Sequence, residues 1–381
     1  MDIYTNQSHE QLRQKVRNFA VNEVKPLARD LDEKEQFSPE LCLKMGQLGL
    51  FGLTIPKEYG GQGLDYLSFI VAVEELARVD SSQAAVLASH NSLGIGPIYN
   101  YGTDQQRAKY LPRLCTGEAI WAFGLTENNA GSDSRGTESK AVLEGDNWLI
   151  NGSKMFISNA STPISAGVTI QVITDEINGK KELSTIIVEK DTQGYRAEKI
   201  HGKMMWRAID TARLYFENVH VPKENLLGVL GGGSKVMLET LDAGRLSIAA
   251  MGLGLARGAY EMAMEYAQTR QQFGKTISKF QSIAFKLADM ATKIELAKNI
   301  LYKACWLKDT NQPYAKEAAM AKLYCAEIAQ EVANESLQIH GAYGLMKDYD
   351  IERFYRDQRL LQIGEGTSEI LRLVISRHIG L

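Results

Sequence analysis

The sequence changes its hydrophobic periodicity twice, and this limits the folds that the chain can adopt. Up to about residue 115, apolar residues recur at three- and four-residue intervals, which is the spacing of one helix face. Between about 119 and 228 the pattern becomes short β-rich runs such as "GVTIQVIT" and "LSTIIVEK", separated by turn signals such as Asn178-Gly179. After the flexible "GGGS" at 231–234 the helical spacing returns in a 3-4-3-4-3 seam: Leu287, Met290, Ile294, Ala297, Leu301 and Ala304.

These three hydrophobic patterns predict a three-part α+β chain. We expect an N-terminal helical domain over 1–118, a middle antiparallel β-barrel or sandwich over 119–230, and a C-terminal helical bundle over 231–381. In the first part, the face formed by Leu12, Val16, Phe19, Ala20, Val24 and Leu27 predicts one amphipathic stretch, and Ser38 followed by Pro39 predicts a helix start. A chain of 381 residues is long enough for two or three packed units.

Composition excludes several classes of function. A formal net charge of -3 gives no electrostatic reason to expect nucleic acid or an anionic membrane as partner. The four cysteines form no CxxC pair, so we expect reduced, buried thiols and no metal site. No signal peptide opens the chain and no apolar run of about 18 residues occurs, which predicts a cytoplasmic protein without a membrane segment.

Three glycines at Gly252, Gly254 and Gly258 superficially suggest a dinucleotide-binding fingerprint. That motif follows a strand and has a different spacing, whereas these flanks are helical. We expect the glycines to permit close helix packing.

The β-rich region offers a better ligand site. The loop "FGLTENNAGSDSRGTESKA" at 123–141 concentrates hydroxyls and backbone N–H groups, as around Thr126 and Ser132. About twenty residues later, Phe156 and Ser158 alternate along a strand, so they share one face. An aromatic plate beside a hydroxyl donor suits a flat cofactor.

Five motifs occur along the chain in the order found in the acyl-CoA dehydrogenases, and the whole chain resembles that family. The motifs are "FGLTENNAGSD", "NGSKMFISNA", "RQQFGK", "QIHGAYG" and "IGEGTSEI". The resemblance implies a helical bundle, a β-barrel and a four-helix bundle, bound FAD, an acyl-CoA substrate, a homotetramer, and electron-transferring flavoprotein as acceptor.

Carried over position by position, the resemblance implies a set of FAD-binding residues. It places Ser132 near both the pyrophosphate and the substrate. Phe156 stands where many members have tryptophan, and Ala342 stands where a second glycine is common. The full set is Phe123, Leu125, Thr126, Gly131, Ser132, Phe156, Ile157, Ser158, Arg270, Gln272, Phe273, Gln281, Gln338, Gly341, Ala342, Thr367 and Glu369.

Glu365 is the expected catalytic base. Oxidation of an acyl thioester requires removal of a weakly acidic α-proton while a hydride leaves the β-carbon for flavin N5. A desolvated carboxylate has a raised pKa suited to that task, and the flanking Gly364 and Gly366 leave room for ligands. Other members carry the base at a position matching Ala243 or Gly244 here, neither of which accepts a proton. A capping glutamate at a helix start is the structural alternative for "GEGTSE".

The expected substrate contacts are Ser132, Asp242, Arg245, Gly364, Gly366 and Arg377. Straight-chain members commonly have tyrosine at the position of Gly364, so we expect a laterally wider pocket for a short branched or alicyclic acyl group. His90 is expected either near the pocket floor or as a satisfied core histidine. Competing hypotheses are a straight short- or medium-chain dehydrogenase, an acyl-CoA oxidase that reduces O2, a silent flavin or acyl-CoA binder, and a purely helical assembly protein.

Overall fold

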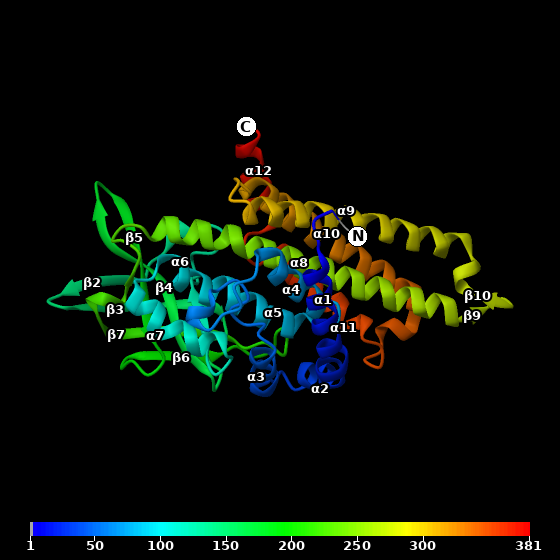
Figure 1. The fold of residues 1–381 in the computed structure, drawn as a ribbon, viewed down its shortest axis with the longest axis horizontal. Helices are drawn as coiled ribbons and strands as arrows, with labels where there is room; N and C mark the ends of the chain where they lie inside the picture. Colours follow the sequence, from blue (N-terminus) through cyan, green and yellow to red (C-terminus); the bar gives the residue numbers. More distant parts are fainter. Residues whose placement is uncertain (1–2) are drawn as a thin grey trace.

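The computed structural model describes residues 3–381, and its elements follow the helical, β, helical order (Figure 1). The N-terminal helices are α1 (Gln7–Phe19), α2 (Lys25–Glu33), α3 (Pro39–Gln47), α4 (Tyr66–Ala77), α5 (Ser81–Ser89), α6 (Gly96–Tyr101) and α7 (Asp104–Cys115). The middle strands are β1 (Ile120–Gly124), β2 (Lys140–Glu144), β3 (Asn147–Ser158), β4 (Ser165–Ile177), β5 (Lys180–Glu189), β6 (Tyr195–Lys199), β7 (Thr211–Pro222) and β8 (Leu226–Leu227). The C-terminal elements are α8 (Gly233–Thr269), β9 (Gln271–Gln272), β10 (Lys275–Thr276), α9 (Gln281–Asp309), α10 (Ala315–His340), α11 (Ile351–Asp357) and α12 (Ser368–His378). The domain boundaries that we propose, after 118 and after 230, fall between elements.

The first helices confirm one local prediction and correct another. Ser38 caps α3, since its hydroxyl accepts a hydrogen bond from the Leu41 N–H at 3.2 Å, and Pro39 occupies the first helical position. Between α1 and α2 lies a π-helical turn, Ala20–Val24. Because a π turn adds residues per turn, the apolar face shifts. Leu27 is therefore 39% exposed, contrary to the prediction, and Ala28 is buried instead.

The middle domain is one mixed sheet rather than a purely antiparallel one. Its strand order is β6-β7-β3-β2-β4-β5-β8, and most neighbours are antiparallel as predicted. However, β1 pairs with β4 in parallel, and the long connection between these two strands permits that crossover. The predicted turn at Asn178-Gly179 is confirmed: both residues have positive φ and join β4 to β5.

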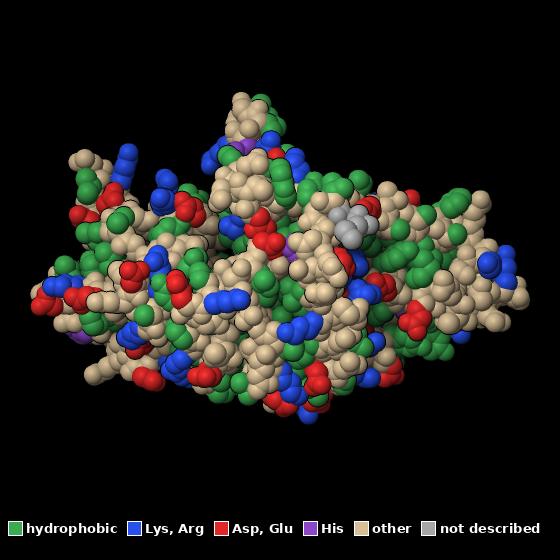
Figure 2. Space-filling view, in the orientation of Figure 1, with side chains coloured by type: hydrophobic (Ala, Val, Ile, Leu, Met, Phe, Trp, Pro, Cys, Tyr) green, Lys and Arg blue, Asp and Glu red, His purple; other side chains and the backbone are tan. Residues whose placement is uncertain are grey.

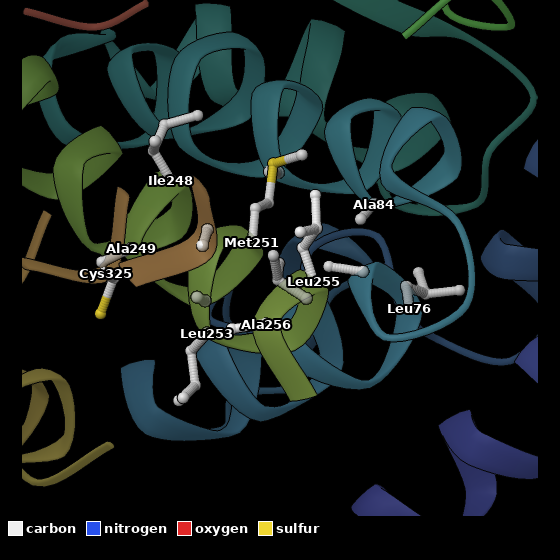
Figure 3. Close-up of a cluster of buried hydrophobic side chains, with 14 of the residues drawn as sticks. Leu76, Ala84, Ile248, Ala249, Met251, Leu253, Leu255, Ala256 and Cys325 are labelled. Atoms are coloured by element: carbon white, nitrogen blue, oxygen red, sulfur yellow. The ribbon is translucent and has the colours of Figure 1, made fainter. Parts of the chain in front are cut away.

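The C-terminal bundle packs around α8, a helix of 37 residues. Its glycines allow the close packing predicted for them: a Cβ at Gly252 would lie 2.7 Å from the Cys325 carbonyl oxygen, and one at Gly254 would lie 2.2 Å from that of Glu74. Figure 3 shows Met251 and Leu255 of α8 in the buried cluster that joins the two helical domains. The seam on α9 is also buried, apart from the half-buried Ile294.

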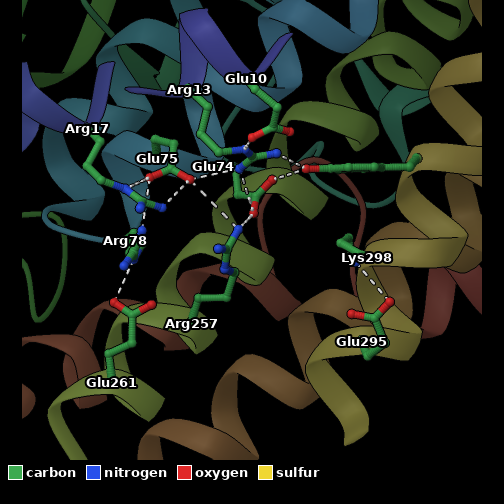
Figure 4. A network of polar contacts seen from close by, with 11 residues as sticks. Glu10, Arg13, Arg17, Glu74, Glu75, Arg78, Arg257, Glu261, Glu295 and Lys298 are labelled. Atoms are coloured by element: carbon green, nitrogen blue, oxygen red, sulfur yellow. Dashed lines mark hydrogen bonds and ion pairs between the residues drawn. The ribbon is translucent and has the colours of Figure 1, made fainter. Parts of the chain in front are cut away.

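A buried ionic cluster holds α4 against α1 and α8 (Figure 4). Glu75 accepts hydrogen bonds from Arg13 at 2.7 Å, Arg17 at 3.0 Å and Arg78 at 3.2 Å. The adjacent Glu74 pairs with Arg257 of α8. Because a buried charge without partners is costly, the cluster favours one relative placement of these helices.

The visible surface carries charges of both signs. Figure 2 shows Lys and Arg side chains interspersed with Asp and Glu over the visible face. Among residues 3–381, no helix is both long enough and apolar enough to cross a membrane.

Candidate active site

Glu365 lies in a turn that precedes α12 and is itself outside the helix. The backbone has φ 51° at Glu365 and 96° at Gly366, so two successive residues are left-handed. This conformation is uncommon for a residue with a side chain and is readily adopted by glycine. The helix cap is Thr367, whose hydroxyl accepts from the Ile370 N–H at 3.3 Å. The capping alternative for Glu365 is therefore wrong.

The Glu365 carboxylate is held in a desolvated position. The residue is half-buried, but its Oε2 atom is completely buried and has no hydrogen-bond partner among residues 3–381. Oε2 packs on α8 at Gly244, where a Cβ would lie 2.0 Å away. Burial raises the pKa of Glu365 from 4.5 to about 7, against the opposing charges of Lys322 and then Arg245.

The neighbouring segment of α8 carries two of the predicted substrate residues, Asp242 and Arg245. Asp242 forms an ion pair with Arg245, and the Arg245 Nε is buried without a hydrogen-bond partner in the described part of the chain. From α4, the Tyr66 hydroxyl donates to the Ala243 carbonyl at 2.8 Å. Thus Asp242 and Arg245 lie in the same region as Glu365.

The end of β3 presents the predicted aromatic plate. Phe156 is 63% exposed, with φ 62°, at an irregularity in the pairing of β3 with β7. Such bulges redirect side chains and are frequent beside active sites. Ser158 is half-buried. Ile157 is only 3% exposed and its side chain belongs to the core of the sheet, which leaves only its backbone for a ligand.

The loop after β1 lies alongside this plate. Phe123 is 9% exposed, and Leu125 and Thr126 are half-buried. The Thr126 carbonyl accepts from the Met155 N–H at 2.8 Å, directly beside Phe156. Gly131 and Ser132 are exposed further along the loop.

A buried ion pair fixes this loop, and the sequence reasoning missed it. Lys154 and Glu127 are 2.6 Å apart, with side chains 0% and 5% exposed. Glu127 also accepts hydrogen bonds from the backbone N–H groups of Glu138 and Ser139. The only signal in the sequence was a lysine inside an apolar strand, which implies a buried partner.

Side-chain contacts connect the plate to the carboxylate. Asn159, which follows Ser158, donates to the Ser89 hydroxyl at 2.9 Å. Leu93, one turn beyond Ser89, lies 3.4 Å from the Cβ position of Gly244. The end of β3 and Glu365 therefore flank the same helical segment. An exposed ring, nearby polar groups and an unpartnered buried carboxylate oxygen fit a planar heteroaromatic cofactor such as the FAD isoalloxazine.

The other predicted FAD residues lie elsewhere. Phe273 and Gly274 form a hairpin turn between β9 and β10, both with positive φ, and Phe273 is 92% exposed. Arg270 stacks over the Tyr343 ring, 5.5 Å from its centroid. Gln272, Gln281, Gln338, Gly341 and Ala342 are all exposed.

One chain does not bring these two groups of residues together. Gly244, next to Glu365, and Arg270 are separated by 26 residues along α8, or about 40 Å at 1.5 Å per residue. Figure 1 places the β9–β10 hairpin at the end of the molecule opposite the β domain.

The remaining predictions have mixed outcomes. The nearest atoms to a Cβ at Gly364 would be those of Leu360, at ordinary distances of 3.5 and 3.6 Å, so there is room beside the carboxylate. Arg377 and Glu369 are exposed on α12, while the Thr367 hydroxyl already caps that helix.

His90 is not a pocket-floor group: it is fully buried, its Nδ1 accepts from the Trp121 N–H at 3.1 Å, and its Nε2 lies 3.0 Å from the Leu114 carbonyl oxygen. It is the satisfied core histidine of the alternative interpretation.

A desolvated carboxylate with a near-neutral pKa and an exposed aromatic ring thus flank one helical segment, an arrangement that can combine proton transfer with a planar cofactor. The family models for the N-terminal, middle and C-terminal domains of acyl-CoA dehydrogenase match residues 6–118, 122–219 and 231–380. The chain belongs to the acyl-CoA dehydrogenase family. It is an oxidoreductase and its cofactor is FAD.

Similar proteins cover the whole chain. It is 45% identical over 379 residues, 100% of each chain, to the short-chain specific acyl-CoA dehydrogenase of Clostridium acetobutylicum. It is 42% identical over 375 residues, 98% of each chain, to the caffeyl-CoA reductase-Etf complex subunit CarC of Acetobacterium woodii. Among solved structures, butyryl-CoA dehydrogenase from Megasphaera elsdenii superposes with a TM-score of 0.96 at 38% identity, covering 100% of both chains.

Proposed function

We propose that Glu365 removes the α-proton of a short acyl-CoA that carries a branch or a ring at its α- or β-carbon, to give the trans-2-enoyl-CoA. The observation that carries this assignment is the buried, unpartnered Oε2 of Glu365, with its pKa raised to about 7. A carboxylate with that pKa is ionised in a large fraction of molecules at neutral pH and is still a useful base.

The protein's own contribution is to hold that carboxylate and exclude water from it. The left-handed backbone at Glu365 and Gly366 directs the side chain, and the absence of a Cβ at Gly244 admits it to α8. Bound FAD would supply a hydride acceptor, N5, for the β-carbon. We assign the ring to Phe123, Leu125, Thr126, Phe156 and Ser158, with the backbone of Ile157, and the pyrophosphate to Gly131 and Ser132.

Substrate contacts follow from the groups around Glu365. Asp242 and Arg245 offer a carboxylate and a partly unpaired guanidinium on the same helix as Gly244. We assign these residues, with Ser132, Gly364, Gly366 and the exposed Arg377, to the acyl-CoA.

Gly364 supports the proposed acyl class. Its Cβ position meets only ordinary contacts, so the pocket keeps lateral space that a larger side chain would fill. The relatives named short-chain specific and butyryl-CoA dehydrogenase favour a short acyl chain. A branch or ring beside the α-carbon uses the space that Gly364 leaves.

A substrate panel tests this class. Purified holoenzyme is mixed anaerobically with isobutyryl, 2-methylbutyryl, isovaleryl, cyclohexanecarboxyl, butyryl and octanoyl esters of CoA, and flavin bleaching is followed. We expect the fastest bleaching with one branched or cyclic ester, and we expect Gly364→Tyr to lose that ester while retaining butyryl-CoA. A preference for octanoyl-CoA, or an equal loss of all esters in Gly364→Tyr, would refute the assignment.

We propose a homotetramer in which a second copy completes each FAD site. The separation of about 40 Å along α8 between Gly244 and Arg270 supports this, because it places the second group of predicted residues far from Glu365. The exposed apolar residues at that end support an interface there: Phe273, Phe285, Leu345 and Met346. The FAD residues that we assign to the second copy are Arg270, Gln272, Phe273, Gln281, Gln338, Gly341 and Ala342. We also keep Thr367 and Glu369 as proposed FAD contacts.

Electron-transferring flavoprotein is the proposed acceptor, in the cytoplasm. The similarity to a subunit of a CoA reductase-Etf complex supports this choice. Fast peroxide formation from acyl-CoA and O2 without that partner would instead identify an oxidase.

A further inference from the structure

Lys322 of α10 is a buried cation beside the base, and nothing in the sequence motifs singles it out. Its side chain is 0% exposed, which is rare for lysine unless the ammonium has partners. Its Nζ donates a hydrogen bond to the Gly366 carbonyl at 2.5 Å. Gly366 directly follows Glu365, so α10 is attached to the turn that carries the carboxylate.

The hydrogen bond places a net positive charge near Glu365. The Gly366 carbonyl is neutral and leaves the ammonium charge uncompensated, whereas the charge of Arg245 is offset by Asp242. Both cations act on Glu365, and Lys322 acts more strongly.

Other groups near this pair complete the electrostatic environment. Tyr66 approaches Glu365 from α4 and directs its hydroxyl to the Ala243 carbonyl. Glu369 of α12 interacts with Lys322 and is itself exposed. Among these groups Lys322 is the buried cation that also contacts the backbone of the Glu365 turn.

We propose that Lys322 is a positioning residue for the dehydrogenation: its ammonium fixes the Glu365–Gly366 turn through the Gly366 carbonyl and keeps the base ionised at neutral pH. The inference rests on the proposed role of Glu365. Without the lysine, a carboxylate without hydrogen bonds in a buried site would stay protonated to higher pH.

The direction of both pKa shifts agrees with this role. Burial raises the pKa of Glu365 to about 7, and Lys322 is the largest influence that lowers it. Burial also lowers the pKa of Lys322 to about 8, against the attraction of Glu365. Between these two values the base is ionised while the lysine is still charged.

Two variants separate the charge from the hydrogen bond. Lys322→Gln keeps a donor for the Gly366 carbonyl but removes the charge, and Lys322→Arg keeps the charge. Lys203→Gln is a matched control, because Lys203 is half-buried and donates to the backbone carbonyls of Trp206 and Ile209, while the main charge acting on it is Asp210.

The experiment uses FAD-loaded holoenzyme with 13C-carboxyl glutamate. The Glu365 signal is identified by its loss in Glu365→Gln and is titrated by NMR, and the pH profile of flavin reduction is measured in parallel. We expect Lys322→Gln to raise the pKa of Glu365 by about one unit. The rate should fall about fivefold at pH 7 and recover at higher pH. Lys322→Arg and Lys203→Gln should leave the pKa unchanged.

The outcomes are distinguishable. An unchanged Glu365 pKa in Lys322→Gln, with a rate lowered equally at all pH values, would show that the lysine only fills buried space and would overturn the inference. Full activity in Glu365→Gln would instead refute the proposed function, whatever the titration shows.

Discussion

Gly244 of α8 and the carboxylate of Glu365 are in direct contact, so closely that a methyl group at position 244 would lie 2.0 Å from Oε2. A Cβ does not occur that close to another heavy atom, so an alanine at position 244 would require the Glu365 carboxylate to shift from this position. The facing positions of α8, Ala243 and Gly244, have no group that accepts a proton, which is consistent with the proposed role of Glu365 as the base.

The first prediction follows from this contact. Gly244→Ala should displace the Glu365 carboxylate and lower kcat by at least about tenfold, since small misplacements of a reacting group are costly. Gly364→Ala is the control, because its nearest contact would be Leu360 at an ordinary 3.5 Å, and it should leave butyryl-CoA turnover nearly intact. Steady-state kinetics of both variants, with circular dichroism to verify folding, measure the effect. Equal rates in Gly244→Ala and wild type would contradict the contact.

The second prediction concerns pH. Because the pKa of Glu365 is about 7, the rate of flavin reduction should rise with pH and level off above that value. Stability should move in the opposite direction: since the folded-state pKa is raised, the contribution of this group is fully present below pH 4.5 and is lost as pH rises from 4.5 through about 7. The difference in denaturant midpoint between wild type and Glu365→Gln, measured from pH 4 to 8.5, isolates the contribution of the Glu365 carboxyl group to stability. A difference that is independent of pH would refute the raised pKa.

The third prediction tests the buried ionic cluster. Glu75→Gln leaves Arg13, Arg17 and Arg78 without their shared carboxylate and should destabilise the protein by about 3 kcal/mol. Asp30→Asn removes an exposed ion pair to Lys34 and should have no measurable effect. Chemical denaturation of the three proteins provides the comparison, and similar midpoints for both variants would argue against a structural role of the cluster.

The fourth prediction concerns assembly. Phe273→Ala should reduce FAD retention and shift light scattering toward smaller species, because an aromatic side chain 92% exposed at a hairpin turn is proposed to lie in an interface. Val142→Ala, at a position 55% exposed on β2, should change neither property. Retention of full FAD content and native mass by Phe273→Ala would contradict the proposed interface.

Periodicity predicted the three-part order because burial of one helix face or one strand face leaves a regular trace in the sequence. The seam on α9, the helix start at Ser38 and the turn at Asn178-Gly179 depend on local physics, and all three are present. The π turn at Ala20–Val24 and the parallel pairing of β1 with β4 depend on tertiary packing, which no local pattern encodes. Leu27 was misplaced for this reason.

In the site, too, some residues could be predicted from the sequence, whereas others depend on tertiary packing. Glu365 was predicted from the resemblance of its motif to the family and from the chemistry of α-proton removal, and its burial agrees with the expected role. Lys322 and the pair of Lys154 with Glu127 were missed, because a buried lysine in a helix or strand resembles a surface lysine until its surroundings are known. His90 was ambiguous in sequence, and its two backbone partners resolve the ambiguity.

The most direct test of the account compares wild type with Glu365→Gln in anaerobic flavin reduction. The two side chains have nearly the same shape, and only the carboxylate accepts a proton. With the best acyl-CoA of the panel, the wild type should bleach rapidly, and the variant should bind the ester but bleach at least about a hundredfold more slowly. Bleaching of Glu365→Gln at the wild-type rate would contradict the assignment of Glu365 as the base.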